Sequence, residues 1–414
     1  MKEANLLVGQ SGGPTTVINS SLAGVIKTAL ESDKINHVYG SINGIKGVLD
    51  DNIIDLADTF EDNEEALDTL KTTPSMYLGS CRVKLSEHEK DETDFRKIFE
   101  QFEKYQIKYF LYIGGNDSMD TVDKLSKYAK ERNYEIYIMG VPKTIDNDLM
   151  EIDHTAGFGS AAKYIAASML EIAHDTYNYY LQSVVIVEIM GRNAGWLTGA
   201  AALAKGEDCP GPDLIYLPEN PFDIKKFSAK VKSLLKKQKS VVVAVSEGIK
   251  TKDGKYVCEL GNDNGYVDAF GHKQLTGTAT FLANTIQAEL GCKTRAFEYS
   301  TLDRSAAHMA SRTDINEAFA AGGAAVKAAF EGDNGKMIIL KRVSDDPYQC
   351  TTDVYDVHKI SNVEKLVPKE WITEDGTYVS DEFISYIEPL IQAELIPLPV
   401  EGIPRHLVLD LTKK

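Results

Sequence analysis

The sequence predicts an α/β protein built on mainly parallel sheets, because one local pattern occurs three times along the chain. In the first unit, apolar residues 5–8 run into a glycine-rich turn at 9–14, and helical spacing of apolar residues follows at 17–28. The same order of strand, turn and helix returns at 107–132 and at 184–204. Repeated units of this kind form parallel sheets covered by helices, so we expect Rossmann-like three-layer domains.

The 414 residues are too many for one ordinary hydrophobic core, and two or three domain-sized units are expected. The remaining expected elements are strands at 135–141, 213–217 and 240–246, helices at 275–290 and 304–330, and an acidic surface helix within 58–68. The tail begins with a strand-like run at 336–343 and ends in a proline-rich stretch at 396–400. It is expected to form a small extension, either a subdomain or an oligomer contact.

Composition and charge exclude several classes of partner. The formal charge of −17 argues against nucleic acid and anionic membranes, because both would be repelled. No stretch approaches ~18 uninterrupted apolar residues, and the first residues lack the apolar core of a signal peptide. We therefore expect a cytoplasmic protein. The five cysteines show no paired spacing of a zinc or redox site, and His154, His174 and His308 are interpreted as core or surface residues.

Two glycine pairs stand where an expected strand gives way to an expected helix, at Gly12-Gly13 and at Gly114-Gly115. Backbone N–H groups at a helix N-terminus bind phosphate, and glycine lets the ligand approach the backbone closely. Each pair alone is better explained as a close-packed turn. Together they predict a phosphate site at the carboxyl ends of the strands, where ligands of parallel sheets collect.

Side-chain oxygens follow the second glycine pair, at Asn116, Asp117 and Asp120. They would repel a naked phosphate, and a bound Mg²⁺ would resolve the conflict because this ion takes hard oxygen ligands together with phosphate oxygens. The alternative is a set of helix-capping residues, with Asp117 or Ser118 at the cap. For Asp120 we favour that alternative.

The segment 142–148 places Lys143, Asp146 and Asp148 directly after an apolar strand. In an extended chain two carboxylates spaced two apart point in related directions, so that one can act as a base while the other assists a metal or the substrate. A plain turn would explain the proline, asparagine and aspartates. It would not explain a lysine at the end of a buried strand.

Arginines and an acid follow other turns and strand ends, where arginine suits bidentate recognition of phosphate. These candidates are Arg82, Arg192 within Met190-Gly191-Arg192, Glu247, Arg295 and Arg304. For each arginine alone, a surface ion pair is an equal explanation. No motif of a hydrolase nucleophile is present. The collected residues suit phosphoryl transfer, which needs positioning, metal and positive charge more than covalent chemistry from the protein.

In this order along the chain, the motifs resemble the phosphofructokinase family over about residues 6–325, most closely its pyrophosphate-dependent branch. The resemblance is carried by residues 12–13, 79–82, 114–118, 142–148 and 190–192, by Glu247 and by Arg304. It implies reversible phosphoryl transfer from pyrophosphate to the C1 hydroxyl of fructose 6-phosphate, giving fructose 1,6-bisphosphate and phosphate, as a step of glycolysis. It also implies Mg²⁺ as cofactor and a homo-oligomer, either a dimer or a tetramer.

The resemblance further implies two domains with the active site in the cleft between them. Residues 1–150 would bind the donor, completed by part of 305–335, and residues 151–304 would bind fructose 6-phosphate. Residues 335–414 would then be a C-terminal extension or subdomain.

Residue roles also follow from the resemblance. Asp146 would be the general base, and Lys143, Asp117 and Asp148 would assist it. Asn116 would hold the metal, although most members have an aspartate there. The implied substrate-binding positions are Gly12, Arg82, Ser118, Thr144, Ile145, Met190, Gly191, Arg192, Glu247, Arg295, Thr301 and Arg304, with Arg295 acting from a neighbouring subunit.

The choice of donor depends on two positions. The ATP-dependent branch has glycine where this chain has Asp117 and Lys143. The Asp117 side chain would fill and charge the space that an α-phosphate needs, whereas Lys143 would neutralise charge on the transferred group or the departing phosphate. Ser183 replaces an arginine that crosses the subunit interface in the ATP enzymes. The rival hypotheses are an ATP-dependent 6-phosphofructokinase and a non-catalytic regulatory subunit that binds sugar phosphate.

Overall fold

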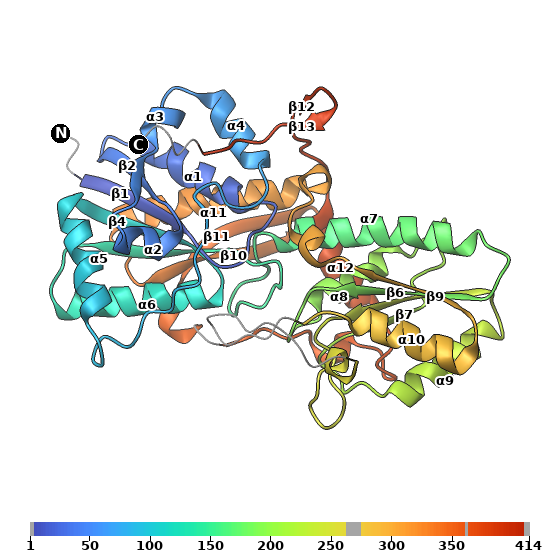
Figure 1. The fold of residues 1–414 in the computed structure, drawn as a ribbon. Coiled ribbons are helices and arrows are strands. Elements are labelled where there is room, and N and C mark those ends of the chain that lie inside the picture. The colour runs from blue at the N-terminus through green and yellow to red at the C-terminus, as the bar shows by residue number, and fades with distance from the viewer. Residues whose placement is uncertain (1–3, 262–274, 361–362, 410–414) are drawn as a thin grey trace.

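The protein has two lobes, each built around its own sheet (Figure 1). A computed structural model describes residues 4–261, 275–360 and 363–409. Helices lie on both faces of the sheets, so that each lobe has three layers. The predicted α/β class and the mainly parallel sheets are therefore confirmed.

The larger sheet has seven strands in the order β11-β10-β5-β4-β1-β2-β3. Its five central strands run parallel, and the edge strands β3 and β11 run antiparallel to their neighbours. The strands are β1 Ala4–Gln10, β2 Ile35–Ser41, β3 Ile53–Asp55, β4 Ile107–Gly114, β5 Tyr137–Pro142, β10 Lys336–Asp345 and β11 Tyr348–Asp356. The helices of this lobe are α1 Ile18–Leu30, α2 Gly44–Leu49, α3 Ala57–Phe60, α4 Glu64–Thr72, α5 Thr93–Lys104, α6 Asn116–Glu131 and α11 Arg312–Glu331.

The smaller sheet has four parallel strands in the order β7-β8-β6-β9. β8 is an unbroken run of buried residues rich in valine, as expected of a parallel strand covered on both faces. The strands are β6 Ser183–Ile189, β7 Leu214–Tyr216, β8 Ser240–Ser246 and β9 Lys293–Glu298. The helices are α7 Phe158–Tyr177, α8 Trp196–Ala200, α9 Ile224–Leu235, α10 Thr278–Leu290 and α12 Asp381–Ile387, and β12 Pro399–Val400 pairs separately with β13 Ile403–Pro404.

Glycines let the first and eleventh helices cross in close contact. A β-carbon added to Gly24 of α1 would lie 2.0 Å from the carbonyl oxygen of Phe319 in α11. One added to Gly322 of α11 would lie 2.0 Å from the carbonyl oxygen of Ser21. Because α11 is thereby held against the helix that follows β1, a segment more than 280 residues later in the chain completes the larger lobe.

Several observed elements differ from the expected ones. The helix predicted at 304–330 begins only at Arg312, where the Ser311 side chain caps α11, and short 3-10 turns precede it. The helix predicted at 193–204 begins at Trp196 and tightens to a 3-10 turn at Ala201–Ala204. Strand β9 was not predicted, because its alternating charged residues form an exposed edge. The strands predicted at 107–113 and 240–246 are confirmed, and that at 213–217 is shorter.

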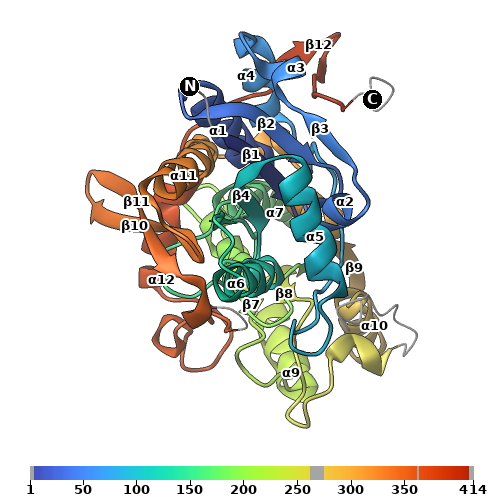
Figure 2. The ribbon, with the colours of Figure 1, turned by 90° about the vertical axis from the view of Figure 1, so that its left-hand side faces the viewer.

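The C-terminal part of the chain divides between the lobes. The expected extension at 335–414 contributes β10 and β11 to the larger sheet, whereas Phe383 and Ile387 of α12 belong to the core of the smaller lobe. β10 and α12 lie side by side (Figure 2), where Arg342 donates a hydrogen bond to the carbonyl oxygen of Tyr386 at 2.9 Å. The domain boundaries at 150, 304 and 335 stay a prediction.

Candidate active site

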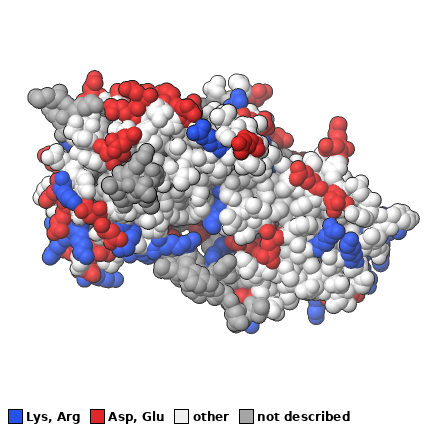
Figure 3. All heavy atoms as spheres, turned by 45° about the horizontal axis from the view of Figure 1, so that its top comes forward, with Lys and Arg blue, Asp and Glu red and all other residues white. Residues whose placement is uncertain are grey.

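The expected site residues follow the carboxyl ends of strands in both sheets. β1 leads into Gly12, β4 into Gly115 and β5 into Lys143, whereas β6 leads into Met190 and β8 into Glu247. Each of these strands is parallel to its neighbours, so its turn lies at one edge of its sheet. Figure 3 shows Lys and Arg side chains along the hollow between the lobes, on a face whose outer margin carries many acids.

Lys143 joins the first glycine turn to the segment after β5. Its buried ammonium group donates a hydrogen bond to the carbonyl oxygen of Gly13 at 2.6 Å, and its backbone N–H donates to the carbonyl of Gly114 at 3.0 Å. Burial lowers the pKa of Lys143 to about 7, against the attraction of Asp146. Gly12 has φ of +81°, and a β-carbon there would lie 3.2 Å from the Lys143 Nζ. Glycine is therefore required both by the backbone and by the lysine.

Asp146 and Asp148 share the same buried region. Burial raises the pKa of Asp146, while Lys143 and Arg304 oppose the shift. Burial and the charge of Asp146 raise the pKa of Asp148 to about 7. The Thr144 hydroxyl accepts a hydrogen bond from the Asp146 backbone N–H at 3.1 Å. Two carboxyls of raised pKa next to a lysine of lowered pKa are an arrangement typical of proton-transfer sites.

The smaller lobe contributes a second set of polar groups. The Met190 backbone N–H donates to Asp303 at 3.0 Å, and the Gly191 N–H donates to Glu247 at 3.4 Å. Burial raises the pKa of Glu247 to about 7 and that of Asp303 to about 8. Asp146 also raises the pKa of Glu247, which places the base candidate of one lobe beside the polar groups of the other.

Arg304 reaches from the smaller lobe to the first glycine turn. A β-carbon added to Gly13 would lie 3.2 Å from an Nη atom of Arg304. Burial lowers the pKa of Arg304, and the charge of Arg82 lowers it further. Its Nε is buried and has no hydrogen-bond partner among the described residues. Arg304 is half-buried, the charge of the exposed Arg82 repels it, and it keeps an unused donor. An anionic ligand would stabilise a cation in this position.

The loop after β4 does not have the capping arrangement that was one of the alternatives. Helix α6 begins at Asn116 with Gly115 at its cap position, and no side chain caps it. Asp117 lies in the first helical turn, Ser118 is buried beneath the loop, and Asp120 pairs with Lys124 at 2.8 Å instead of capping. A carboxylate in the first turn of α6 therefore lies beside backbone N–H groups that would otherwise be available to phosphate.

Other expected residues occupy different surroundings. The side chain of Ile145 is buried in the core of the smaller lobe. Arg82 and Thr301 are exposed. Arg295 lies in the middle of β9, paired with Val185 of β6, and its guanidinium is 3.3 Å from Asp175. Within one chain, Arg295 therefore lies away from Asp146 and the residues that act on its charge, Lys143 and Arg304.

Two residues in or beside the segment 142–148 were not expected. Glu364 pairs with Leu149 through its backbone, and its charge raises the pKa of both Asp146 and Asp148. The neighbouring backbone is also held there, since the Asn116 amide donates to the carbonyl of Val363 at 3.1 Å. No sequence pattern joins residues more than 200 positions apart, so only the fold reveals this contact.

Asn147 is the second unexpected residue. It is fully buried and lies between the two aspartates with φ of +53°. The sequence did not single out this asparagine, because the residues around it are also common in turns.

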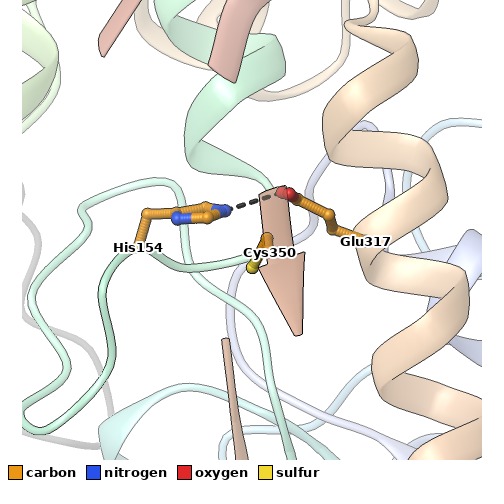
Figure 4. Close-up of side chains that lie close together, drawn as sticks. All are labelled: His154, Glu317 and Cys350. Carbon is orange, nitrogen blue, oxygen red and sulfur yellow. Dashed lines mark hydrogen bonds and ion pairs between the residues drawn. The ribbon is translucent and has the colours of Figure 1, made fainter. Parts of the chain in front are cut away.

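His154 lies in a cluster with Glu317 and Cys350 (Figure 4). Its Nδ1 is 2.7 Å from Asp153 and its Nε2 is 2.7 Å from Glu317. These carboxylates raise the pKa of His154 to about 9 despite complete burial. The imidazole is therefore protonated at neutral pH and serves as an ion-pair partner, in agreement with the interpretation of His154 as a core histidine.

None of the helices in the described part of the chain combines the length and the hydrophobicity that crossing a bilayer requires.

The sequence profile of the family described as Phosphofructokinase matches residues 5–300. The pyrophosphate–fructose 6-phosphate 1-phosphotransferase of Halomonas elongata is 41% identical over 98% of this chain and 96% of its own. The enzyme of that name from Xanthomonas campestris is 42% identical, with 99% and 97% of the two chains covered.

A solved structure supports the same assignment. The pyrophosphate-dependent phosphofructokinase of Nitrosospira multiformis superposes with a TM-score of 0.88 and 38% identity, covering 98% of this chain and 96% of its own. The profile covers residues 5–300, and the relatives and the solved structure agree with it over nearly the whole chain. The chain belongs to the phosphofructokinase family.

Proposed function

We propose that this protein is a pyrophosphate-dependent 6-phosphofructokinase, which transfers a phosphoryl group reversibly between pyrophosphate and the C1 hydroxyl of fructose 6-phosphate. The observation that carries the proposal is the buried Lys143, whose ammonium group joins the first glycine turn and lies within electrostatic reach of Asp146. A lysine in this place offers positive charge to a compact, highly charged donor. The names of the relatives that cover almost the entire chain support the same reaction.

Asp146 is proposed as the general base. It would accept the proton of the C1 hydroxyl while that oxygen forms a bond to phosphorus and the bond from phosphorus to the departing phosphate breaks. Lys143 and Arg304, which both act electrostatically on Asp146, would favour its ionised form and stabilise the charge on the transferred group. Burial would exclude water, so that the phosphoryl group passes to the sugar and is not hydrolysed.

The remaining residues would bind the two substrates. Asp117, Ser118, Gly12 and Arg82 are proposed on the donor side. The residues proposed for fructose 6-phosphate are Thr144, Ile145, Met190, Gly191, Arg192, Glu247, Thr301 and Arg304. Arg295 is proposed to contact the sugar phosphate of a neighbouring subunit, because it is partly exposed and lies away from Asp146 in its own chain.

The donor set fits a hard divalent cation, and we propose Mg²⁺. One carboxylate oxygen of Asp148 is buried without a hydrogen-bond partner in the described ranges, and Asn116 and Asp117 carry further side-chain oxygen atoms at the start of α6. Oxygen donors of this kind are the usual Mg²⁺ ligands. When bound, the cation would neutralise part of the charge on the pyrophosphate oxygens. The Asn116 amide, positioned by its bond to Val363, would turn its oxygen to the cation.

The donor is tested by kinetics with both candidates. Purified protein is assayed with fructose 6-phosphate and either pyrophosphate or ATP as the donor. We expect activity with pyrophosphate and none with ATP. The double variant Asp117→Gly with Lys143→Gly should lose at least about tenfold in kcat/KM for pyrophosphate and gain measurable use of ATP. Strong ATP activity of the wild type without pyrophosphate activity would contradict the proposal. An unchanged donor preference in the double variant would show that these two residues do not select the donor.

The regulatory-subunit hypothesis explains less of the site. A protein that only binds sugar phosphate needs no carboxyl of raised pKa beside a lysine of lowered pKa. We further propose a cytoplasmic enzyme of glycolysis that acts as a dimer or tetramer. Light scattering of the purified protein measures the assembly, and a monomer with full activity would remove the proposed role of Arg295.

A further inference from the structure

Asn147 has an unusual backbone conformation for a residue that separates two functional carboxylates. Its φ of +53° lies in the left-handed region, which most residues other than glycine avoid and which asparagine tolerates best among them. It is also completely buried. Such a conformation persists when the surrounding structure determines it, so the contacts of Asn147 decide how the backbone enters Asp146 and leaves toward Asp148.

Both ends of the Asn147 amide are used. Its Oδ1 accepts a hydrogen bond from the Thr155 backbone N–H at 3.0 Å. Its Nδ2 donates to the Tyr386 hydroxyl at 3.0 Å, and that hydroxyl in turn donates to the carbonyl oxygen of Asp153 at 2.5 Å. The hydroxyl of Tyr386 therefore links Asn147 to the backbone of Asp153, six residues later in the same loop.

Tyr386 itself is held firmly from several sides. The Arg342 guanidinium lies 4.8 Å from the centre of its ring and donates to its carbonyl oxygen at 2.9 Å. The same guanidinium pairs with the Asp153 carboxylate at 3.1 Å, and the carboxylate oxygen that it contacts, Oδ2, also lies 2.7 Å from the Nδ1 of His154. The Trp371 ring centre lies 5.4 Å from that of Tyr386. A tyrosine fixed in this way can impose its geometry on the loop.

We propose that Tyr386 is a positioning residue for phosphoryl transfer, acting through Asn147 to set the directions of the Asp146 and Asp148 carboxylates. This rests on the proposed function, in which Asp146 is the base. It assigns a role to the C-terminal part of the chain, because α12 reaches the catalytic segment from 230 or more positions away in sequence. Tyr386 contacts no reacting atom, so its effect is expected on turnover more than on substrate binding.

The variant Tyr386→Phe removes only the hydroxyl. We expect kcat to fall by about ten- to a hundredfold, because a small displacement of a catalytic group costs this much, while the KM values for both substrates stay within about threefold. Tyr378→Phe is the matched control, since the Tyr378 hydroxyl is also buried but has no hydrogen-bond partner within the described residues. The control should retain wild-type kcat. Equal kcat in Tyr386→Phe and Tyr378→Phe would overturn the proposal.

A double-mutant cycle separates positioning from a general loss of stability. Glycine adopts a left-handed conformation without strain, so Asn147→Gly should keep the turn but lose the amide. If Tyr386 acts through Asn147, adding Tyr386→Phe to Asn147→Gly should lower kcat by less than about twofold further. Multiplication of the two full effects would show that Tyr386 acts by another route and would refute the inference.

Failure of the proposed function would be recognised separately. Asp146→Asn that keeps its turnover would show that the base is wrongly assigned. The same cycle measured by thermal unfolding would then still report whether the Tyr386 hydroxyl and Asn147 are coupled. Additive changes in Tm would exclude the coupling whatever the identity of the base.

Discussion

The buried His154 makes the stability of this protein depend on pH in a direction that can be tested. The pKa of a histidine in an unfolded chain is close to 6.5, and in the folded protein Asp153 and Glu317 raise it to about 9 despite burial. Protonated His154 therefore stabilises the folded state. This contribution is fully present below pH ~6.5 and is lost as the pH rises through about 9.

The size of the effect follows from the same two values. Each pKa unit corresponds to ~1.4 kcal/mol, and the shift from 6.5 to about 9 therefore gives about 3 kcal/mol of unfolding free energy. Because His154 is 1% exposed, solvent does not screen this contribution. Replacing His154 by glutamine removes the titrating group while keeping a side chain that can donate a hydrogen bond.

The assay is urea unfolding of the wild type and His154→Gln at several values between pH 6 and 10. The variant should be less stable at pH 6, and the difference between the two proteins should shrink by about 3 kcal/mol on reaching pH 10. His174→Gln, which alters an exposed histidine of α7, should follow the wild type throughout. A difference between wild type and His154→Gln that stays constant with pH would refute the argument, because it would show that His154 does not titrate in this range.

Other predictions concern the site and the packing of the larger lobe. Asp146→Asn should lower kcat by roughly 10²–10⁴, measured in either direction of the reaction, and a loss below about tenfold would argue against a base at this position. Gly12→Ala should raise the KM for pyrophosphate by roughly tenfold but not that for fructose 6-phosphate, because the methyl group would strain a φ of +81° and lie 3.2 Å from Lys143 Nζ. Equal changes in both KM values would contradict this. Gly24→Ala should destabilise the protein by about 3 kcal/mol, because its methyl group would meet an α11 carbonyl at 2.0 Å. In thermal unfolding, Gly206→Ala, with only a 3.5 Å side-chain contact, is the control, and equal Tm values would exclude the clash.

The parallel strands and the turns after them could be predicted because their signals are local. Apolar runs such as 240–246 and 107–113 end at glycine or polar residues within a few positions, and the structure places strands over the same residues. Strand β9 and the start of α11 were missed for a physical reason. An edge strand with exposed charged residues has no apolar run that would reveal it in the sequence. The alanines before Arg312 have a high helix propensity, but in the folded chain this segment is not part of α11.

The sequence by itself determined the family, the glycine turns after the strands and the residues of the segment 142–148, since these depend on residue types at short spacing. Only the tertiary structure decided what surrounds them. Burial brings the pKa of Lys143 to about 7, and Glu364 comes close enough to raise the pKa of Asp148. Tyr386 forms a hydrogen bond with Asn147, 239 positions away in the sequence. Burial and charge proximity are properties of the folded chain, because they depend on which distant segments exclude water from a group.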